Sequence, residues 1–491
     1  MSRNVFLSFV GFSEYVTCNY YFENEEDKIE KTRFVQEAII RHEFKDWTEN
    51  DAYYFFATES AKKNNWDNGK FSKADKCAGI VGNNEKDKKG LYDLLVVDNK
   101  KKNVKLFNIG EGYTEKEIWN IFYTIEEQIQ EDDCVYLDST HAFRSLPMLG
   151  IVLLNYLKAT KNITIGEIYY GAFEKLGPVS KVIGTDELPG MELEDRNAPV
   201  LKLRSFNEIM NFSFGAKLFN DKGNADLLCQ SIDEMCNREE EIEYKKILRD
   251  KFSDKLKEIS QNFQTCRGGK IYDAEEFKSL EETLKKLDSP EYKGTMDYKA
   301  FGPLLKLIEN KFREFKSSKD VKNGFIAADW CFKHGMYQQS ITLLQETIVS
   351  VGVSHVFAEQ PGKDCKYYEI HQCRELVEKY LSYNSKKKDD NSSGPAPEEW
   401  KGKLQNIINA DSNLNENRIN EKLVELQKWR NDYQSLSDLR NNVNHAGILL
   451  KSNICDKGYD NAQKYKSADD IKNGLEKLLS KIQRNIDPEV Q

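Results

Sequence analysis

The chain has 491 residues, 39% of them hydrophobic and 31% charged, and is long enough for two or three folded domains. Its formal net charge of −9 at pH 7 argues against a protein that coats nucleic acid through bulk electrostatics, but it leaves room for a small local RNA site. No signal peptide is apparent, and the longest apolar run, residues 146–157, is shorter than the roughly 20 residues that span a bilayer. We therefore expect a cytoplasmic protein without a membrane partner.

The first 200 residues alternate between short apolar runs and helical patterns. The apolar runs predict strands at 5–11, 52–58, 92–97, 134–140 and 163–173. Helical patterns occupy 26–44, 114–130 and 143–161, and the NKKKN segment at 99–103 is typical of a hairpin tip. Such alternation predicts an α/β domain with a mostly parallel sheet covered on both faces.

After about residue 204 the strand signals end and periodic helical segments follow. We expect helices at 240–260, 274–287, in a block at 325–353, twice between 418 and 450, and at 467–485. The stretch SKKKDDNSSGPAPEE at 385–399 has the composition of a mobile loop. The sequence therefore predicts an all-α half behind the α/β domain.

Two predicted strands end in polar residues that could form a ligand site. The first runs into Gly11, Phe12 and Ser13, where glycine allows close backbone approach. The other precedes a hydroxyl-rich segment and a helix, with the side chains of Ser139, Thr140, His141, Arg144 and Ser145. Free N–H groups at a helix start, together with arginine, suit a phosphate. The alternative is that Ser139 and Thr140 only cap the helix.

The same two segments carry a family resemblance. SFVGFSEY at 8–15 and YLDSTHAFRSLPML at 136–149 resemble the ligand loops of CARF domains, the Rossmann-like modules of CRISPR-associated ancillary proteins. The resemblance covers roughly residues 1–204. It implies a homodimer that binds a cyclic oligoadenylate, for which the cyclic tetraadenylate is our first expectation. A GxGxxG fingerprint is absent, which disfavours an ordinary dinucleotide cofactor.

A second cluster lies near the C-terminus, in LRNNVNH at 439–445. Arg440 can donate twice to a phosphoryl oxygen, His445 can transfer a proton near neutral pH, and Asn441 adds a neutral donor. On an ideal helix Arg440 and His445 point about 140° apart. The motif therefore either spans an irregular helix start or acts together with a second copy of itself across a dimer axis.

Arg440 and His445, late in a helical domain, resemble the Arg-x4–6-His signature of HEPN ribonucleases. This resemblance implies cleavage of single-stranded RNA that leaves a 2′,3′-cyclic phosphate. No Asp or Glu lies within 439–445, which fits chemistry without Mg²⁺. The cysteines form no CxxC pair, and the spacing of Cys365, His371 and Cys373 matches no zinc pattern, so we expect reduced thiols, no metal and no cofactor.

Together these features predict a CARF domain at 1–204, a helical connecting domain at 205–324 and a HEPN domain at 325–491. The expected function is an endoribonuclease of type III CRISPR defence that a cyclic oligoadenylate activates, acting as a homodimer or a higher oligomer. Two alternatives stay open. The chain could be a sensor that regulates transcription without catalysis, although no C-terminal helix is strongly basic. The N-terminal domain could also degrade its own activator as a ring nuclease, with His141 or Ser13 contributing.

Overall fold

The computed structural model describes residues 2–13, 15–70, 87–141, 146–185, 188–236, 243–316, 318–358, 367, 369–383, 397–444 and 466–486. The chain divides into two compact units, Met1–Asn207 and Glu208–Gln491. The predicted loop at 385–399 lies outside the described residues except for 397–399, which begin a helix.

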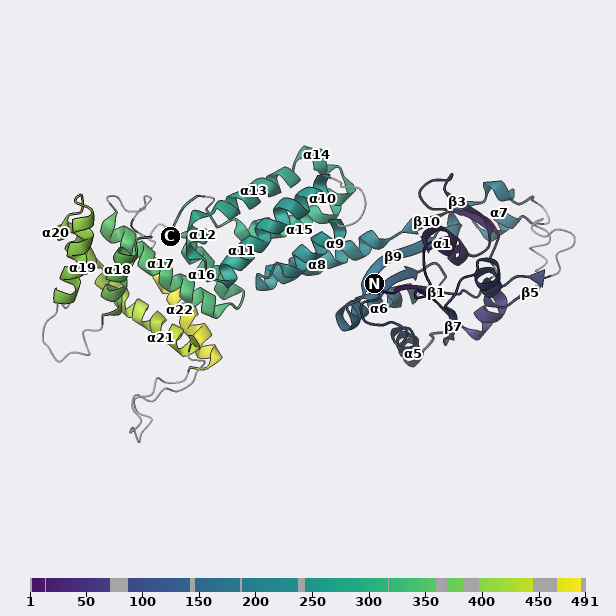
Figure 1. Ribbon diagram of the computed structural model, residues 1–491, viewed down its shortest axis with the longest axis horizontal. Coiled ribbons are helices and arrows are strands. Elements are labelled where there is room, and N and C mark those ends of the chain that lie inside the picture. Colours follow the sequence, from purple (N-terminus) through teal and green to yellow (C-terminus); the bar gives the residue numbers. More distant parts are fainter. Residues whose placement is uncertain are drawn as a thin grey trace, which may run out of the picture. The chain divides into compact units, whose positions relative to one another are not determined.

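The first unit contains an eight-stranded mixed sheet in the order β3-β2-β10-β9-β8-β1-β4-β7 (Figure 1). The strands are β1 Asn4–Phe9, β2 Cys18–Tyr21, β3 Lys28–Thr32, β4 Ala52–Ala57, β7 Val104–Asn108, β8 Cys134–Asp138, β9 Thr164–Gly171 and β10 Asn197–Lys202. The pairs between β9, β8, β1, β4 and β7 are all parallel. β10 joins this core antiparallel to β9, and a short β5–β6 hairpin (Gly69–Lys70, Asp87–Lys88) is separate.

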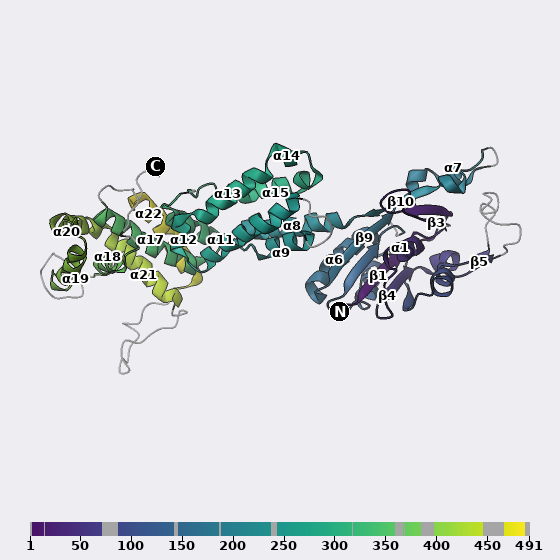
Figure 2. The ribbon, with the colours of Figure 1, turned by 45° about the horizontal axis from the view of Figure 1, so that its top comes forward.

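The order of the parallel strands defines where a ligand would bind. From β1 the chain adds β4 and β7 on one side and then β8 and β9 on the other, which is the Rossmann order 3-2-1-4-5. The order reverses between β1 and β8, and Figure 2 shows β1 inside the sheet between β9 and β4. In such sheets the ligand crevice lies beyond the carboxyl ends of the two strands at the reversal.

Side chains of the central strands alternate between two apolar layers, because successive residues of a strand point to opposite faces. Val5, Leu7 and Phe9 belong to one core cluster, with residues of helices α5 (Glu115–Glu126) and α6 (Leu146–Lys161). Phe6 belongs to the other, together with Val35 and further residues of helix α1 (Val35–Glu43). Both faces of the sheet are therefore covered, as predicted from the alternating apolar and helical segments.

The helical segments of the first unit are as follows: α1 Val35–Glu43, α2 Glu59–Ala61, η1 Lys62–Trp66, α4 Leu91–Asp93, η2 Leu94–Asp98, α5 Glu115–Glu126, α6 Leu146–Lys161, η3 Phe173–Leu176, α7 Val179–Ile183 and η4 Leu193–Asp195. Helix α5 begins where Thr114 accepts a hydrogen bond from the backbone N–H of Glu117, 3.2 Å away. Three predictions are wrong. Residues 92–97 are helical, 99–103 follow a helix and form no hairpin tip, and 26–44 contain β3 before α1.

The reason for the helix at 92–97 is visible in its burial. Leu91 and Leu95 are both fully buried, four residues apart, whereas Val97 is 61% exposed. A spacing of four places side chains on one face of a helix, and a strand would have buried alternate residues instead. Short apolar runs do not separate these two patterns.

The second unit is helical throughout its described residues, with one continuous core from Phe212 to Ile482. Its first half contains α8 Arg204–Lys222 (which begins in the first unit), α9 Asp226–Cys236, α10 Glu243–Ile247, η5 Leu248–Ser253, α11 Asp254–Gln264, α12 Gly268–Asp273, α13 Glu275–Leu287, α14 Pro290–Lys293 and α15 Met296–Phe312. Its second half contains α16 Asn323–Lys333, α17 Tyr337–Phe357, α18 His371–Ser382, α19 Pro397–Ala410, α20 Glu416–Glu425, η7 Leu426–Trp429, α21 Arg430–Asn444 and α22 Ala468–Ile486.

The helices predicted for this half are confirmed, and the architecture of an α/β domain followed by helices is the one predicted. The boundary at 324 stays a prediction, since residues from both sides of it share one core. Among the described helices, α17 alone is long and apolar enough to cross a membrane, yet 72% of its apolar window is buried inside the protein, as in a core helix.

Candidate functional site

The sheet brings together the ends of β1 and β8, which are about 130 residues apart in sequence. Ser8 and Asp138 are register partners in the parallel β1–β8 pair. The segments Gly11–Ser13 and Ser139–His141 follow these strands, so they emerge side by side at the carboxyl edge. This is the crevice at the strand reversal, and it contains six of the eight predicted ligand residues.

Asp138 is fully buried and organises this edge. Ser8 Oγ donates to its Oδ2 at 2.7 Å, and the backbone N–H and hydroxyl of Thr140 donate to its Oδ1 at 3.0 and 2.5 Å. Burial raises the pKa of the Asp138 carboxyl, and the donors from Thr140 and Ser8 oppose that shift. Thr140 Oγ1 also accepts from the N–H of Gly171 at 2.8 Å, which fixes the turn after β8 to the end of β9.

Ser139 is held in a similar way, because its N–H and its Oγ both donate to the carbonyl of Tyr169 at 2.9 Å. Both predicted hydroxyls are thus used to join the ends of β8 and β9. Among the described residues neither hydroxyl bonds to the backbone of α6, which is described from Leu146, so the helix-cap alternative is neither confirmed nor excluded. Their direct contact with a ligand stays a prediction, and their structural role is to shape the backbone of the crevice.

Gly11, Tyr15 and His141 pack together at this edge, where a Cβ added to Gly11 would lie 2.7 Å from the Tyr15 hydroxyl and 3.3 Å from the His141 Cβ. The Tyr15 hydroxyl accepts a hydrogen bond from the N–H of Gly11 at 2.6 Å, and its ring stacks on the His141 imidazole at 4.1 Å between centroids. Burial lowers the pKa of His141 to about 3, so the ring is neutral at physiological pH. Its Nε2 is buried and has no hydrogen-bond partner among the described residues.

Two asparagines that the sequence analysis did not single out hold the glycine loop. Asn65, fully buried in η1, donates from Nδ2 to the carbonyls of Gly11 and Ser13 at 2.8 Å, and Asn64 donates to the carbonyl of Phe12 at 3.0 Å. The loop therefore keeps its shape while Phe12 stays 58% exposed. The available signal was the Asn-Asn pair directly before Trp66, the buried aromatic residue that ends η1.

The remaining predicted ligand residues, Arg144 and Ser145, lie outside the described residues. Their placement in the crevice stays a prediction. No group of three or more His, Cys, Asp or Glu side chains with metal-binding geometry occurs within the described part of the chain. Of the two cysteines considered and rejected as zinc ligands in the sequence, Cys373 is fully buried in the helical core and Cys365 lies outside the described residues.

The C-terminal motif lies at the end of α21, which is helical through Asn444. Arg440 is half-buried, and its Nε is buried without a hydrogen-bond partner among the described residues. Asn442 is buried and accepts from the N–H of Lys466 at 3.4 Å, whereas Asn441 is half-buried. His445 lies outside the described residues, so its position relative to Arg440 stays a prediction. The described part of the motif, residues 439–444, lies within the last turns of α21 and not at a helix start, which was one of the two expected explanations.

Helix α17 provides the polar support beneath Arg440. Gln345, 3% exposed, donates from Nε2 to Ser437 Oγ at 3.1 Å, one turn before Arg440 on α21. Burial raises the pKa of Tyr433 to about 12, while hydrogen bonding to Gln345 and the charge of Arg440 lower it. The charge of the Arg440 guanidinium therefore acts on a buried polar cluster made of Gln345, Tyr433 and Ser437. Gln345 was not predictable, because a glutamine within an apolar helix does not reveal its partner.

Comparisons with known proteins agree with this geometry. The family described as "CRISPR system endoribonuclease Csx1, CARF domain" matches residues 5–174. The CRISPR-associated protein MJ1674 of Methanocaldococcus jannaschii is 26% identical over 368 residues, which cover 70% of this chain but only half of that relative.

Among solved structures, Enterococcus italicus Csm6 bound to cyclic hexa-2′-fluoro-hexa-dAMP aligns with all of this chain and 96% of its own. Its identity is 14% and its TM-score 0.37, and a similarity at this level decides nothing about the present chain. The resemblance of the N-terminal segments to CARF domains is confirmed by the family match, whose range contains both strand ends of the crevice. Residues 5–174 therefore match the Csx1-type CARF domain, and a CRISPR-associated protein is among the relatives of the chain.

Proposed function

We propose that this protein is an endoribonuclease that a cyclic oligoadenylate switches on, acting in the cytoplasm as a homodimer in type III CRISPR defence. The observation that carries the proposal is the crevice between β1 and β8, in which a CARF domain presents the Gly11–Ser13 backbone beside His141. A cyclic oligoadenylate has phosphates for backbone N–H groups and adenines for exposed rings such as Phe12. We take the cyclic tetraadenylate as the activator.

The reaction we propose is transesterification within single-stranded RNA. The 2′-hydroxyl attacks the adjacent phosphorus, the bond to the 5′-oxygen breaks, and the products are a 2′,3′-cyclic phosphate and a 5′-hydroxyl. Arg440 supports this role, since its half-buried guanidinium has an unpartnered Nε among the described residues and can stabilise charge on the phosphoryl oxygens. His445 would transfer a proton, and Asn441 would assist. We propose that this step requires no metal ion.

The test is cleavage of a fluorophore-quencher RNA in the presence of EDTA, with cyclic tri-, tetra- and hexaadenylate supplied in turn. We expect one ring size, the tetramer first, to activate cleavage and chelation to have no effect. Arg440→Ala should abolish cleavage while activator binding, measured by calorimetry, is retained. Arg484→Ala, which removes an exposed arginine on α22 of the same unit, is the matched control and should cleave normally.

Cleavage that requires added Mg²⁺ or Mn²⁺, or that survives in Arg440→Ala, would contradict the proposed chemistry. Incubating the protein with the activator alone tests the ring-nuclease alternative, for which the neutral, unpartnered imidazole of His141 is the favouring observation. Linear oligoadenylate products would show that this activity exists beside the first. Activator binding without RNA cleavage, accompanied by duplex DNA binding, would favour a transcription regulator.

A further inference from the structure

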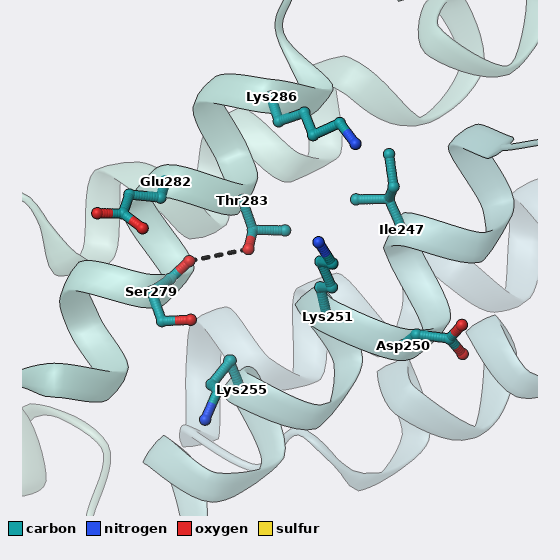
Figure 3. Close-up of a pocket in the computed structure, with 8 residues that line it drawn as sticks. All are labelled: Ile247, Asp250, Lys251, Lys255, Ser279, Glu282, Thr283 and Lys286. Carbon is teal, nitrogen blue, oxygen red and sulfur yellow. Dashed lines mark hydrogen bonds between the residues drawn. The ribbon is translucent and has the colours of Figure 1, made fainter.

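A polar pocket of about 400 Å³ lies in the second unit between two helical segments (Figure 3). One wall is the run from α10 through η5 to α11, where Ile247, Lys251 and Lys255 recur every four residues. The other is α13, where Ser279, Glu282, Thr283 and Lys286 follow the spacing of one helix face. The two stripes face each other, and three lysines line the space between them.

The cations point into the pocket and the carboxylates point out of it. Figure 3 shows the ammonium groups of Lys251 and Lys286 approaching each other over Thr283, while Asp250 and Glu282 extend away on opposite sides. Like charges on facing helices repel unless an anion lies between them. The arrangement therefore resembles an anion site more than an ion-paired helix surface.

The lysines are also only weakly engaged by the rest of the protein. Lys251 makes no hydrogen bond or ion pair with the described residues. Lys286 lies 3.6 Å from Glu243, in an exposed pair that water and salt screen. Lys255 is held more firmly by Glu258 at 2.9 Å. The ammonium groups of Lys251 and Lys286 can therefore bind a ligand without the loss of a strong ion pair.

The hydroxyls of α13 add neutral donors. Thr283 Oγ1 donates to the carbonyl of Ser279 at 2.8 Å, so its proton is used within the helix. The Ser279 hydroxyl is half-buried, points toward the pocket, and has no hydrogen-bond partner among the described residues. A tetrahedral phosphodiester could accept from Ser279 and from both ammonium groups. None of the described lining residues is aromatic, so the pocket offers no ring on which a base could stack.

We propose that this pocket binds a phosphodiester of the single-stranded RNA substrate, away from the cleavage site and without reading base sequence. The proposal rests on the proposed function. The space accommodates a nucleotide unit rather than a lone inorganic ion. In a chain of net charge −9, RNA must be held by a local group of cations, and the pocket belongs to the same unit as Arg440. Lysine contributes point charges, which attract phosphate whatever the sequence.

The test is binding of a fluorescein-labelled 2′-O-methyl RNA strand, measured by anisotropy between 50 and 200 mM salt with and without cyclic tetraadenylate. Lys251→Gln/Lys286→Gln removes two pocket charges. Lys257→Gln/Lys285→Gln removes two exposed charges from the same helices, outside the pocket, and is the matched control. The pocket is proposed to hold one phosphodiester, and the salt slope for single-stranded RNA changes by about 0.7 per phosphate contact, so the pocket variant should lose a slope of about 0.7 and bind roughly tenfold more weakly. The control should bind within about twofold of the unaltered protein.

The proposal is overturned if both double variants weaken binding equally, which would indicate bulk charge, or if neither does. It is also overturned if AMP or cyclic tetraadenylate binds the protein more tightly than the RNA strand does, and if that tighter binding disappears in Lys251→Gln/Lys286→Gln. The 2′-O-methyl strand has no free 2′-hydroxyl and cannot be cleaved, so the measurement does not depend on catalysis. Cleavage of ordinary RNA with no difference between the variants would refute the pocket and leave the proposed function standing.

Discussion

Replacing Thr140 by valine tests how the crevice is held together. The substitution keeps the shape of the side chain and removes the hydroxyl that donates to Asp138 and accepts from the N–H of Gly171. Asp138 is fully buried and Gly171 is buried as well, so water cannot replace either bond without opening the edge of the sheet. Thr140→Ser is the matched control, because it retains the hydroxyl and loses one methyl group.

The expected cost follows from the two bonds. A hydrogen bond to a charged group contributes about 1.5–3 kcal/mol, and an orphaned buried N–H costs about 1–3 kcal/mol. Allowing for partial relaxation, we expect Thr140→Val to destabilise the first unit by about 3 kcal/mol. Thr140→Ser should cost about 0.8 kcal/mol, the value of one methyl group. Since every 1.4 kcal/mol is tenfold, these costs correspond to roughly 150-fold and roughly fourfold faster opening.

Native-state hydrogen exchange read by mass spectrometry is the suitable assay, since it reports the two units separately. Peptides from β8 and β9 should exchange roughly 150-fold faster in Thr140→Val, while peptides from α17 in the second unit remain unchanged. If the valine and serine variants exchange alike, the Thr140 hydroxyl does not hold this edge and the account of the crevice is wrong.

Three further outcomes are expected. Gly11→Ala should weaken activator binding at least tenfold in calorimetry, because the added Cβ would lie 2.7 Å from the Tyr15 hydroxyl. Adding Tyr15→Phe to the same chain should restore most of the affinity. If the affinity does not recover, the clash with Tyr15 is not the cause. Arg3→Gln should lower the free energy of unfolding in urea by about 2 kcal/mol, since the Arg3 guanidinium contacts Asp133 at 3.0 and 2.6 Å at the amino ends of β1 and β8. Activator affinity should be unchanged, because these residues lie at the other end of the strands from the candidate site, and a loss of affinity would contradict this placement. The pKa of His141 is lowered to about 3 from its ordinary 6.5, so the folded state stays unprotonated while the unfolded state takes up a proton below pH 6.5, and stability falls as the pH drops toward 3. His141→Gln should make the pH dependence shallower in that window, and an unchanged profile would refute the assignment.

The sequence was most informative where both faces of a strand are buried. β1, β4, β8 and β9 are mostly apolar and buried, and all four were predicted close to their observed positions. β3 was missed because its residues KIEKT are mostly polar and partly exposed, as expected next to the edge of a sheet. β7 was missed for the same reason, since it forms the other edge with alternating polar residues. An edge strand forms backbone hydrogen bonds with only one neighbouring strand, and its amino-acid composition gives only a weak strand signal.

The candidate crevice was predictable as a meeting of two strand ends, because the Rossmann order places β1 beside β8. The partners of its side chains were not. Nothing in the sequence indicates that the Thr140 hydroxyl bonds to Gly171, or that Asn65 holds a loop 52 residues earlier in the chain. Such contacts connect elements whose spacing in sequence carries no periodic signal. The sequence therefore indicated the candidate residues through their chemical type, whereas their hydrogen-bond partners became known only from the structure.

The pairing of β1 with β8 also determines when the N-terminal domain can fold during synthesis of the chain. Val5 to Ser8 pair with Val135 to Asp138, so more than 120 residues must be made before the first strand has its inner neighbour. Contacts of such sequence separation form slowly, after the loop between them has closed. A nascent or truncated chain ending before Gly171 also lacks the β9 end to which Ser139 and Thr140 are fastened. A chain that ends before Gly171 therefore lacks the contacts that shape the site in which we propose that the activator binds, and only a complete domain can take part in the proposed recognition.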